Sequence, residues 1–359
     1  MNGVSTSATA RFGYVAGLDG LRLLAVAIVV VAHYRLLPNV PGGFGVSIFF
    51  FISGFLISRL LLAEEKTHGR IALGRFYIRR LIRLLPPLLL MGVVAVPLLV
   101  WIDPAGFSWS QLLLSFAYLG NVQKIGARLL GWDAGYDALE PLWSLAVEEH
   151  FYLLLPPVLL FVRRGTSRII LLAAILSGAL ALRMAVSWMA PQQADNINYN
   201  FTLTRIDAIG WGVFLTLLLD AGVLRVSCFE RRAYWLLWGG SAAMIASLVH
   251  WADWYEVAFK YTPQSIAIGV AFCGLIFPER TLWARRIAEW PTVRYLGRIS
   301  YELYLWHFPI YFVVGHFLPA PFPRALLSLV LTAAVSTLAY SVTTQRLGPL
   351  RKRYGSHPV

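Results

Sequence analysis

The sequence is poor in charged residues and in cysteine. Charged side chains occupy 14% of its 359 positions, whereas a soluble domain carries about a quarter. Cys228 and Cys273 lie far apart with neither a metal-binding nor a redox spacing, so we predict no disulfide framework. The first ten residues lack the basic region that opens a signal peptide. A soluble domain and a disulfide-stapled secreted domain are therefore excluded.

Familiar catalytic signatures are missing as well. The sequence has no Gly-x-Ser-x-Gly elbow and no His-Glu-x-x-His pair. The glycines within 41–57 follow no strand and are not accompanied by Gly-Lys-Ser/Thr, so they form no nucleotide loop. A serine-hydrolase elbow and a zinc site have no local support, and we expect no metal.

Long apolar runs are what the sequence does have. Hydrophobic residues make up 58% of the chain, and runs of about 20 residues, each long enough to cross a bilayer, recur along it. We predict an all-α polytopic membrane protein with both ends cytoplasmic. Its transmembrane domain is 18–345, preceded by an N-terminal tail, 1–17, and followed by a basic C-terminal tail, 346–359. The expected spans are 18–37, 44–63, 84–102, 142–162, 168–190, 204–221, 234–251, 263–278, 299–317 and 324–344.

The net charge of +13 reports topology rather than nucleic-acid binding. With a cytoplasmic N-terminus, most of the 31 Lys and Arg residues fall in cytoplasmic connections and tails. This asymmetry is the positive-inside signature of membrane proteins. We therefore predict a multi-pass protein of a bacterial inner membrane, in contact with lipids and without a nucleic-acid partner.

Residues 108–122 are apolar but short for a span. If they crossed fully, Arg163 and Arg164 would lie outside, against the charge asymmetry. We expect one short re-entrant or interfacial helix here, in a long outer connection from Asp103 to Pro141.

The first predicted span carries three ionisable groups on one face. Arg22 and His33 are separated by about three turns, roughly 16 Å along a helix, and Asp19 lies three residues before Arg22. Ionisable groups inside a membrane usually face the protein interior or a hydrated cavity. This span is therefore expected to form one wall of a polar site, although an Asp19–Arg22 ion pair is a simpler role for Arg22.

Arg80 and Arg83 form an Arg-x-x-Arg pair before the third span, in FYIRRLIRLLP. Helical spacing puts both guanidinium groups on one face, where two planar forks suit phosphate oxygens. A basic anchor at the membrane surface is the alternative. Pro86 and Pro87 are expected to mark the start of the span or a kink in it.

Glu148 lies in LWSLAVEEHFYLLLP, beside Glu149 and His150. Carboxylates in an apolar stretch need partners, so one should point inward to a histidine or an arginine. An acidic patch at the outer headgroups, within an aromatic belt, is the alternative.

Two further polar groups are candidates for the site. Arg205 and Asp207 open the sixth span, where a structural salt bridge is the simplest account, and Gly210 and Gly212 allow close helix approach. A polar stripe opens the ninth span, with interhelical hydrogen bonding as its simplest role. The stripe consists of Ser300, Tyr301, Tyr304 and His307.

Five segments in order resemble the acyltransferase-3 family of membrane acyltransferases, which includes O-antigen, exopolysaccharide and Nod-factor O-acetylases and macrolide O-acyltransferases. The resemblance covers nearly the whole chain. The segments are LDGLR with His33, GGFGVSIFFFISGFLI, FYIRRLIRLLP, LWSLAVEEHFYLLLP and GRISYELYLWHFPI.

The resemblance implies a cytoplasmic acyl-CoA donor, with acetyl as the default group, and a hydroxyl acceptor on a glycan, glycolipid or macrolide. It implies that His33 is the catalytic histidine and that Arg22 belongs to the same motif as His33. It also implies that Arg80 and Arg83 lie on the side where the donor binds. Glu148 fits the motif glutamate, whereas His150 stands where the family usually has glutamine. Some relatives carry an additional C-terminal hydrolase-like domain, whereas this sequence ends about fifteen residues after its last predicted span, so we expect the membrane part to complete the transfer alone.

The expected mechanism is acyl transfer with His33 as general base for the acceptor hydroxyl. Glu148 would orient or charge-stabilise His33, and Arg80 and Arg83 would bind the CoA phosphates. The position of His33 near the outer end of its span suggests an acceptor at the outer leaflet. The alternative is a transporter or lipid-binding protein that uses the same groups as a proton relay.

Overall fold

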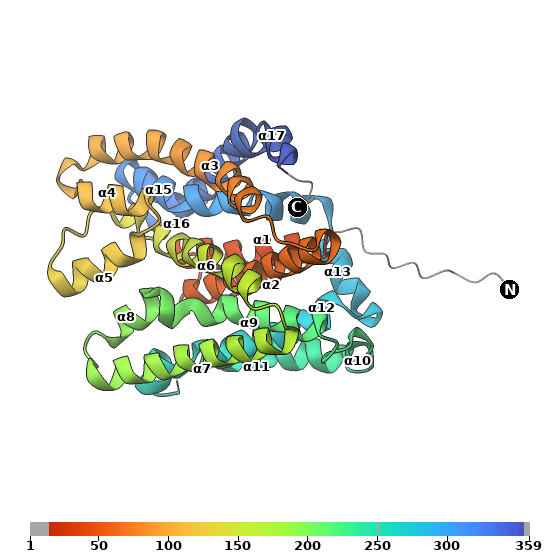
Figure 1. The fold of residues 1–359 in the computed structure, drawn as a ribbon. Helices are drawn as coiled ribbons and strands as arrows, with labels where there is room; N and C mark the ends of the chain where they lie inside the picture. Colours follow the sequence, from red (N-terminus) through yellow and green to blue (C-terminus); the bar gives the residue numbers. More distant parts are fainter. Residues whose placement is uncertain (1–13, 250, 355–359) are drawn as a thin grey trace.

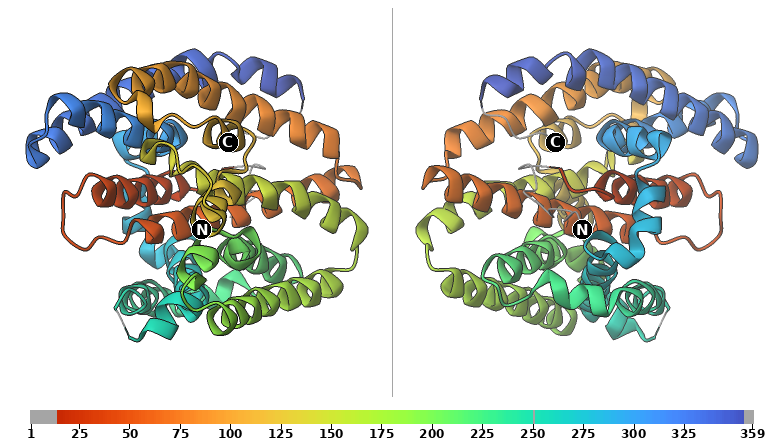
Figure 2. Two further views of the ribbon diagram at one scale, coloured as in Figure 1. Left: turned by 90° about the vertical axis from the view of Figure 1, so that its left-hand side faces the viewer. Right: turned by 90° about the vertical axis from the view of Figure 1, so that its right-hand side faces the viewer.

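The computed structural model describes residues 14–249 and 251–354, so residues 1–13 and 355–359 of the two predicted tails lie outside the described residues. The described chain is a bundle of helices without strands. Figures 1 and 2 show α2 in the middle, with α3, α15 and α16 on one side and α7, α9 and α12 on the other. The long elements are α1 (Leu18–His33), α2 (Gly42–His68), α3 (Leu73–Ile102), α6 (Leu142–Phe161), α7 (Gly165–Met189), α9 (Thr202–Asp220), α12 (Tyr261–Ile276), α15 (Ser300–Phe317) and α16 (Pro321–Tyr340).

Shorter elements complete the bundle, and most of them connect the long helices at its two ends. One group lies at the end away from the N-terminus: η1 (Pro104–Gly106), α4 (Trp109–Phe116), α5 (Gly120–Leu130), η2 (Asp137–Leu139), α8 (Ala194–Asn200) and the π-helix η4 (Tyr255–Phe259). The rest are α10 (Val226–Arg231), the π-helix η3 (Trp235–Gly239), α11 (Gly240–Ala246), η5 (Glu279–Thr281), α13 (Leu282–Ala288), α14 (Pro291–Arg298), the π-helix η6 (Ser341–Gln345) and α17 (Gly348–Arg353).

The helices confirm the all-α membrane architecture but not the number of spans. Among the described residues, six helices are long and apolar enough to cross a membrane, or seven if α12 and the helix bent from it by 88° form one span. The first expected span is shorter than predicted, because α1 has 16 residues and ends at His33. The expected span over 234–251 is divided into η3 and α11.

Two local predictions need correction. The single helix expected over 108–122 is two helices, because Tyr118 adopts a left-handed conformation (φ 57°) between α4 and α5. Both lie at the end of the bundle away from the N-terminus (Figure 1). α3 begins at Leu73, so Pro86 and Pro87 lie inside that helix and not at its start.

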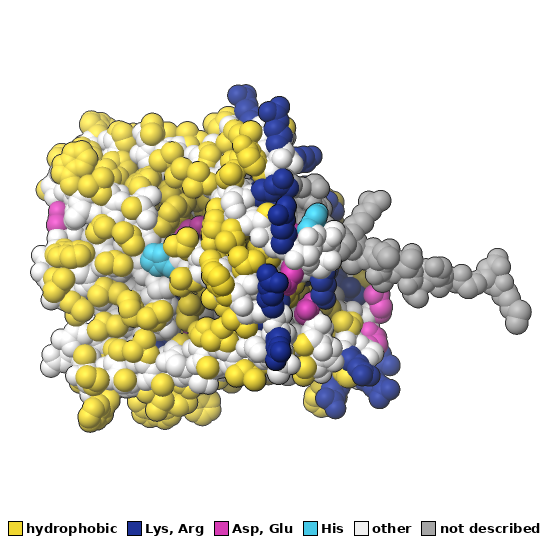
Figure 3. Space-filling view, viewed as in Figure 1, with side chains coloured by type: hydrophobic (Ala, Val, Ile, Leu, Met, Phe, Trp, Pro, Cys, Tyr) yellow, Lys and Arg dark blue, Asp and Glu magenta, His cyan; other side chains and the backbone are white. Residues whose placement is uncertain are grey.

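The basic side chains gather at one end of the molecule. Figure 3 shows Lys and Arg in a band beside the N-terminal end, while hydrophobic side chains cover most of the remaining face. Because α1 begins at this end, it corresponds to the cytoplasmic side in the predicted topology. We refer to it as the basic end, and to the opposite end as the far end.

Small residues allow α2 to contact α9 closely. A Cβ at Gly54 would overlap the carbonyl oxygen of Ile209, and a Cβ at Gly212 would overlap that of Phe51. The two helix backbones therefore meet without intervening side chains, as expected from small residues at membrane helix interfaces. Gly210 instead faces Leu176 of α7.

We expect Gly54→Ala to destabilise the protein by at least about 1–3 kcal/mol, because the added methyl group has no space between the two backbones. The midpoint of thermal unfolding in detergent measures the effect. Gly178→Ala in α7 is the matched control, since nothing lies within 4 Å of a Cβ there. Equal unfolding midpoints for the two variants would contradict the close contact.

Candidate active site

A cavity of about 690 Å³ lies inside the bundle, and its lining includes Arg22, Arg80 and Arg83 from the parts of α1 and α3 nearer the basic end. We call it the inner cavity. Two smaller cavities, of about 580 Å³ and 500 Å³, adjoin it, because Arg83 lines all three. The inner cavity is lined from α1, α2, α3, α6 and α15, and so by all five segments that carried the resemblance. Its polar lining consists of Arg22, Ser53, Arg80, Arg83, Ser144, Glu148, Tyr152, Ser300, Tyr301 and Tyr304.

Arg80 and Arg83 face this space and not the lipid surface. The Arg80 guanidinium lies 3.5 Å from the centre of the Tyr152 ring, and its Nε and Nη2 are buried without a hydrogen-bond partner in the described chain. Arg83 forms no hydrogen bond or ion pair with the described residues. Arg351 lines both smaller cavities beside Arg83. The result is a cluster of cations with unused donors, which suits an anionic ligand.

Asp19 and Arg22 line the cavity of about 500 Å³. Arg22 Nη1 is 3.9 Å from Asp19 Oδ1, and Arg298 Nε is 3.8 Å from Asp19 Oδ2. The simpler role considered for Arg22, an ion pair with Asp19, is therefore present. Arg22 also lines the inner cavity, so the ion pair leaves it accessible to a ligand there.

Glu148 lies within the inner cavity and not among outer headgroups. The hydroxyls of Ser53 and Tyr152 donate to its Oε1. The ring of Tyr152 in turn supports the guanidinium of Arg80. Glu148 is thus connected to the cation cluster through Tyr152 and does not contact His33. His150, whose role the sequence left open, hydrogen-bonds the Thr202 hydroxyl at the start of α9, at 2.8 Å.

His33 and His307 form a direct pair. His33 Nδ1 lies 2.8 Å from His307 Nε2, and His307 Nδ1 lies 2.6 Å from the carbonyl oxygen of Tyr304. The His33 ring also stacks on Phe308, with centroids 4.4 Å apart. The imidazole therefore faces protein, as expected for an ionisable group within a membrane.

These contacts assign the protons on both rings. A carbonyl oxygen only accepts, so His307 carries its proton on Nδ1 and presents Nε2 as an acceptor. His33 then donates from Nδ1, which leaves its own Nε2 with a free lone pair. The charges that act on the His33 ring belong to Glu140 and Lys124, which form an ion pair with each other.

His33 does not line the inner cavity. Tyr304 does line the cavity and connects it to the histidine pair: its ring centre is 5.5 Å from that of His307 and 6.3 Å from that of Phe49. Its hydroxyl is 2.6 Å from Ser144 Oγ and donates to the carbonyl oxygen of Pro141 at 2.9 Å. Phe49, Ser144 and Tyr304 all line the cavity, and together we call them the roof. The polar groups of the first span are thus divided between two sides of the roof.

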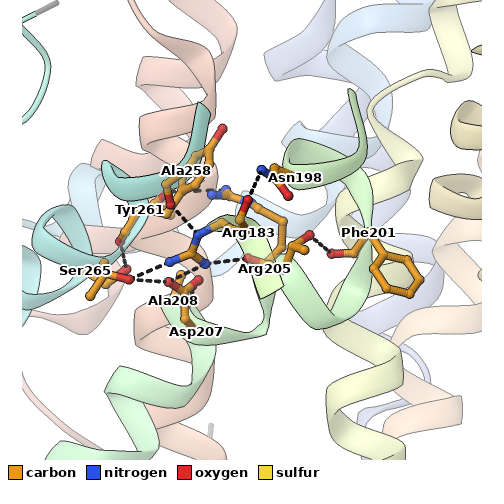
Figure 4. Close-up of polar contacts among 12 residues, drawn as sticks. Arg183, Asn198, Phe201, Arg205, Asp207, Ala208, Ala258, Tyr261 and Ser265 are labelled. Carbon is orange, nitrogen blue, oxygen red and sulfur yellow. Dashed lines mark hydrogen bonds and ion pairs between the residues drawn. The ribbon is translucent and has the colours of Figure 1, made fainter. Parts of the chain in front are cut away.

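The expected salt bridge between Arg205 and Asp207 is absent from the described chain. Figure 4 shows that Asp207 instead pairs with Arg183 of α7, Nη1 to Oδ2 at 2.9 Å, with both side chains fully buried. Arg183 also donates to the carbonyl oxygen of Ala258 at 2.7 Å, and Thr262 donates to Asp207 at 3.1 Å. This network joins α7, α9 and α12. The pair is structural and lies outside the inner cavity.

Arg205 has a different environment. It is fully buried, lies 4.1 Å from the centre of the Tyr261 ring and 5.4 Å from that of Tyr199, and has only a long hydrogen bond, 3.4 Å, to Ser47. Its Nε and Nη1 have no hydrogen-bond partner among the described residues. Cation–π contacts therefore replace the predicted ion pair.

Of the late polar stripe, Ser300, Tyr301 and Tyr304 line the inner cavity. Tyr301 also donates to the carbonyl oxygen of Leu84 at 2.9 Å, which fulfils the interhelical bond expected there. The sequence motifs did not predict a place in the site for Ser53, Tyr152 or Arg351. The signal for Tyr152 was its position four residues after Glu148, on the same helix face.

Comparison with known proteins agrees with the five motifs. The acyltransferase-3 family model, described as an acyltransferase domain, matches residues 15–341. The chain is 30% identical to the peptidoglycan O-acetyltransferase OatA of Listeria monocytogenes, over 91% of this chain and 54% of the relative. A putative O-acetyltransferase of Staphylococcus aureus is 29% identical, over 87% of this chain and 53% of the relative.

A putative peptidoglycan O-acetyltransferase of Bacillus subtilis, YrhL, is 28% identical over 84% of this chain and 49% of its own length. The chain thus spans about half the length of these relatives. No solved structure matches it. The family match confirms the resemblance predicted from the motifs.

Proposed function

The chain belongs to the acyltransferase-3 family, and we propose that it transfers an acetyl group from cytoplasmic acyl-CoA to a hydroxyl of a glycan. The observation that supports this proposal is that two features follow one another along the bundle. A cavity is lined by unpaired arginines nearer the basic end, and a histidine with a free nitrogen lies beyond its roof. The first feature suits an anionic donor, and the second suits a base for a hydroxyl.

The topology belongs to the same proposal. Ten spans with both ends in the cytoplasm put the basic end inside and the far end outside. The α1 and α15 helices count as spans in this arrangement, although each is short or polar, because both are packed within the bundle. The donor then enters from the cytoplasm, and His33 lies at the outer end of α1.

Arg80, Arg83 and Arg351 would bind the phosphates of the donor, because their side chains line the adjoining cavities at the basic end. Phosphate oxygens would satisfy the buried Nε and Nη2 of Arg80. The thioester arm would extend between α2 and α15 toward the roof. Glu148 holds Tyr152 in place under Arg80 and so maintains the shape of this wall.

His33 would accept the hydroxyl proton at Nε2 as the acceptor oxygen forms its bond to the acyl carbon and the thiolate of CoA leaves. His307 remains neutral and accepts a hydrogen bond from His33 Nδ1, which stabilises the imidazolium that forms. The Lys124–Glu140 ion pair lies near the ring and contributes no net charge to it. The roof has to open for the thioester to reach His33.

Peptidoglycan is the proposed acceptor, because two of the relatives are named for its O-acetylation. The proposal is tested with the purified chain in nanodiscs, radiolabelled acetyl-CoA and soluble peptidoglycan fragments. We expect alkali-labile label on the glycan, as for an ester. Thioester turnover with label on a lipid or a small cytoplasmic molecule, and none on the glycan, would contradict it.

We expect His307→Ala to lower kcat by about 10- to 100-fold, a part of the contribution of a general base, with a smaller change in KM. The reason is that His33 loses the acceptor that fixes its tautomer. His307→Gln should restore part of the activity, because its amide oxygen accepts from Nδ1. The pH dependence of kcat should shift in the alanine variant. Equal kcat values for the alanine and glutamine variants would contradict this positioning role.

A further inference from the structure

A second cavity lies at the far end of the bundle, separate from the inner cavity. It encloses about 530 Å³ and is formed where the start of α2, α8, η4 and α12 meet. We call it the outer pocket. Of the motifs that carried the resemblance, the second alone reaches it, through Gly43 and Phe44. Its lining includes Gly43, Tyr199, Glu256, Lys260, Tyr261 and Gln264.

The lining combines aromatic rings with uncharged and paired polar groups. Tyr199 and Tyr261 line one side, with ring centres 6.5 Å apart. Lys260 Nζ lies 2.7 Å from Glu256 Oε2 and 5.4 Å from the centre of the Tyr261 ring. Gln264 adds an amide. Because the ammonium and the carboxylate neutralise each other, the pocket suits a neutral ligand with many hydroxyls and not an anion.

A buried cation holds the two tyrosines. The Arg205 guanidinium lies 4.1 Å from the centre of the Tyr261 ring and 5.4 Å from that of Tyr199, and it is fully buried. Cation–π attraction strengthens when the cation is desolvated. The aromatic wall is therefore set in place before a ligand arrives, which lowers the ordering cost of binding.

The outer pocket and His33 lie on two sides of the first turn of α2. A Cβ at Gly43 would lie 2.7 Å from the Tyr199 hydroxyl, whereas a Cβ at Gly42 would lie 4.0 Å from His33 Nε2. Adjacent Cα atoms are about 3.8 Å apart. Two consecutive glycines thus lie next to the pocket on one side and next to the nitrogen that would act as base on the other.

We propose that the outer pocket binds one pyranose ring of the acceptor glycan, next to the ring whose hydroxyl reaches His33. One face of a pyranose carries C–H groups that pack on an aromatic ring, and its rim carries hydroxyls for Glu256, Lys260 and Gln264. The proposal rests on the proposed function for the identity of the acceptor. It adds a subsite that positions the glycan across the glycine turn.

The test measures binding of a peptidoglycan tetrasaccharide, two repeats of N-acetylglucosamine and N-acetylmuramic acid, to the full chain in nanodiscs without donor. We expect Lys260→Met and Gly43→Ala each to raise the Kd by about tenfold. The first removes a hydrogen-bond donor, and the second forces Tyr199 out of its present position in the pocket wall. Arg128→Met is the matched control, because it also removes one cation at the far end but from an exposed site outside the pocket.

Two results would overturn the proposal: no binding by the unaltered chain, or an unchanged Kd in both variants with unfolding midpoints equal to that of the control. If one of the two variants has a lowered unfolding midpoint, Gln264→Leu replaces it, and the Kd of Gln264→Leu is interpreted in the same way. The outcomes are separable from those of the proposed function. If the glycan binds in a way that depends on Lys260 but no acetyl group is transferred, the result supports the outer pocket and contradicts the proposed function. If the acetyl group is transferred but the variants leave the Kd for the glycan unchanged, the result supports the function and contradicts the pocket.

Discussion

Replacing His33 with alanine is expected to lower acyl transfer by about 10²- to 10⁴-fold, the usual contribution of a general base. His33 is the histidine whose Nε2 the hydrogen-bond pattern leaves free, since His307 uses both of its nitrogens. The variant should retain its fold, because the ring lies at the end of α1 and its loss removes a single hydrogen bond, the one to His307. Label transferred from acetyl-CoA to the glycan measures the effect.

His316→Ala is the matched control for this variant. His316 lies at the same end of the bundle, on α15, and is exposed. Its loss should leave acyl transfer unchanged. Comparable activity in the two variants at equal amounts of folded protein would remove His33 from the reaction. Loss of acetyl-CoA binding in His33→Ala would also count against the base role, because the ring is separated from the donor cavity by the roof.

The double variant Arg80→Ala, Arg83→Ala should raise the Kd for acetyl-CoA by at least about 100-fold. Each arginine supplies charge-assisted hydrogen bonds worth about 1.5–3 kcal/mol when they are made to a phosphate. Both guanidinium groups line the cavity and have donors that the described protein does not use. Binding of acetyl-CoA to the chain in nanodiscs, followed by calorimetry at fixed salt, gives the two constants.

The control for the arginine pair is Arg70→Ala, Arg75→Ala. These two residues belong to the same connection and are exposed, so the control removes the same charge from outside the cavity. Its Kd should change little, because exposed charges are screened by salt. Equal losses in both double variants would mean that the arginines act only through net charge, and the membrane-anchor interpretation would then hold.

Local spacing predicted those parts of the site that lie on one helix face. Arg80 and Arg83, three residues apart, do line the same cavity. Gly212 of the sixth predicted span does allow close approach of a neighbouring helix, at Phe51 of α2. In each case the periodicity of a single helix was sufficient, because the relevant groups project from one side of it.

Residue spacing within one helix did not predict which residues of distant helices would pair. His33 and His307 are 274 positions apart, and Asp207 pairs with Arg183 of another helix instead of its neighbour Arg205. Such pairs depend on how helices pack, which a single sequence does not encode in its local pattern. The same holds for the roof: the sequence placed Tyr304 in a polar stripe and predicted no role for Phe49, and only the fold brings the two rings together.

The contact between α2 and α9 also determines which parts of the protein can move. At Gly54 and Gly212 the peptide groups of the two helices touch, so neither helix can slide or rotate against the other without a backbone collision. Phe49 is carried by α2 and shares that immobility. The opposite half of the roof is carried by α15, which has Pro309 within it and therefore lacks one helical hydrogen bond. If an acyl group passes the roof as proposed, we therefore expect the Tyr304 side of the roof, on α15, to move and the Phe49 side, on α2, to stay in place.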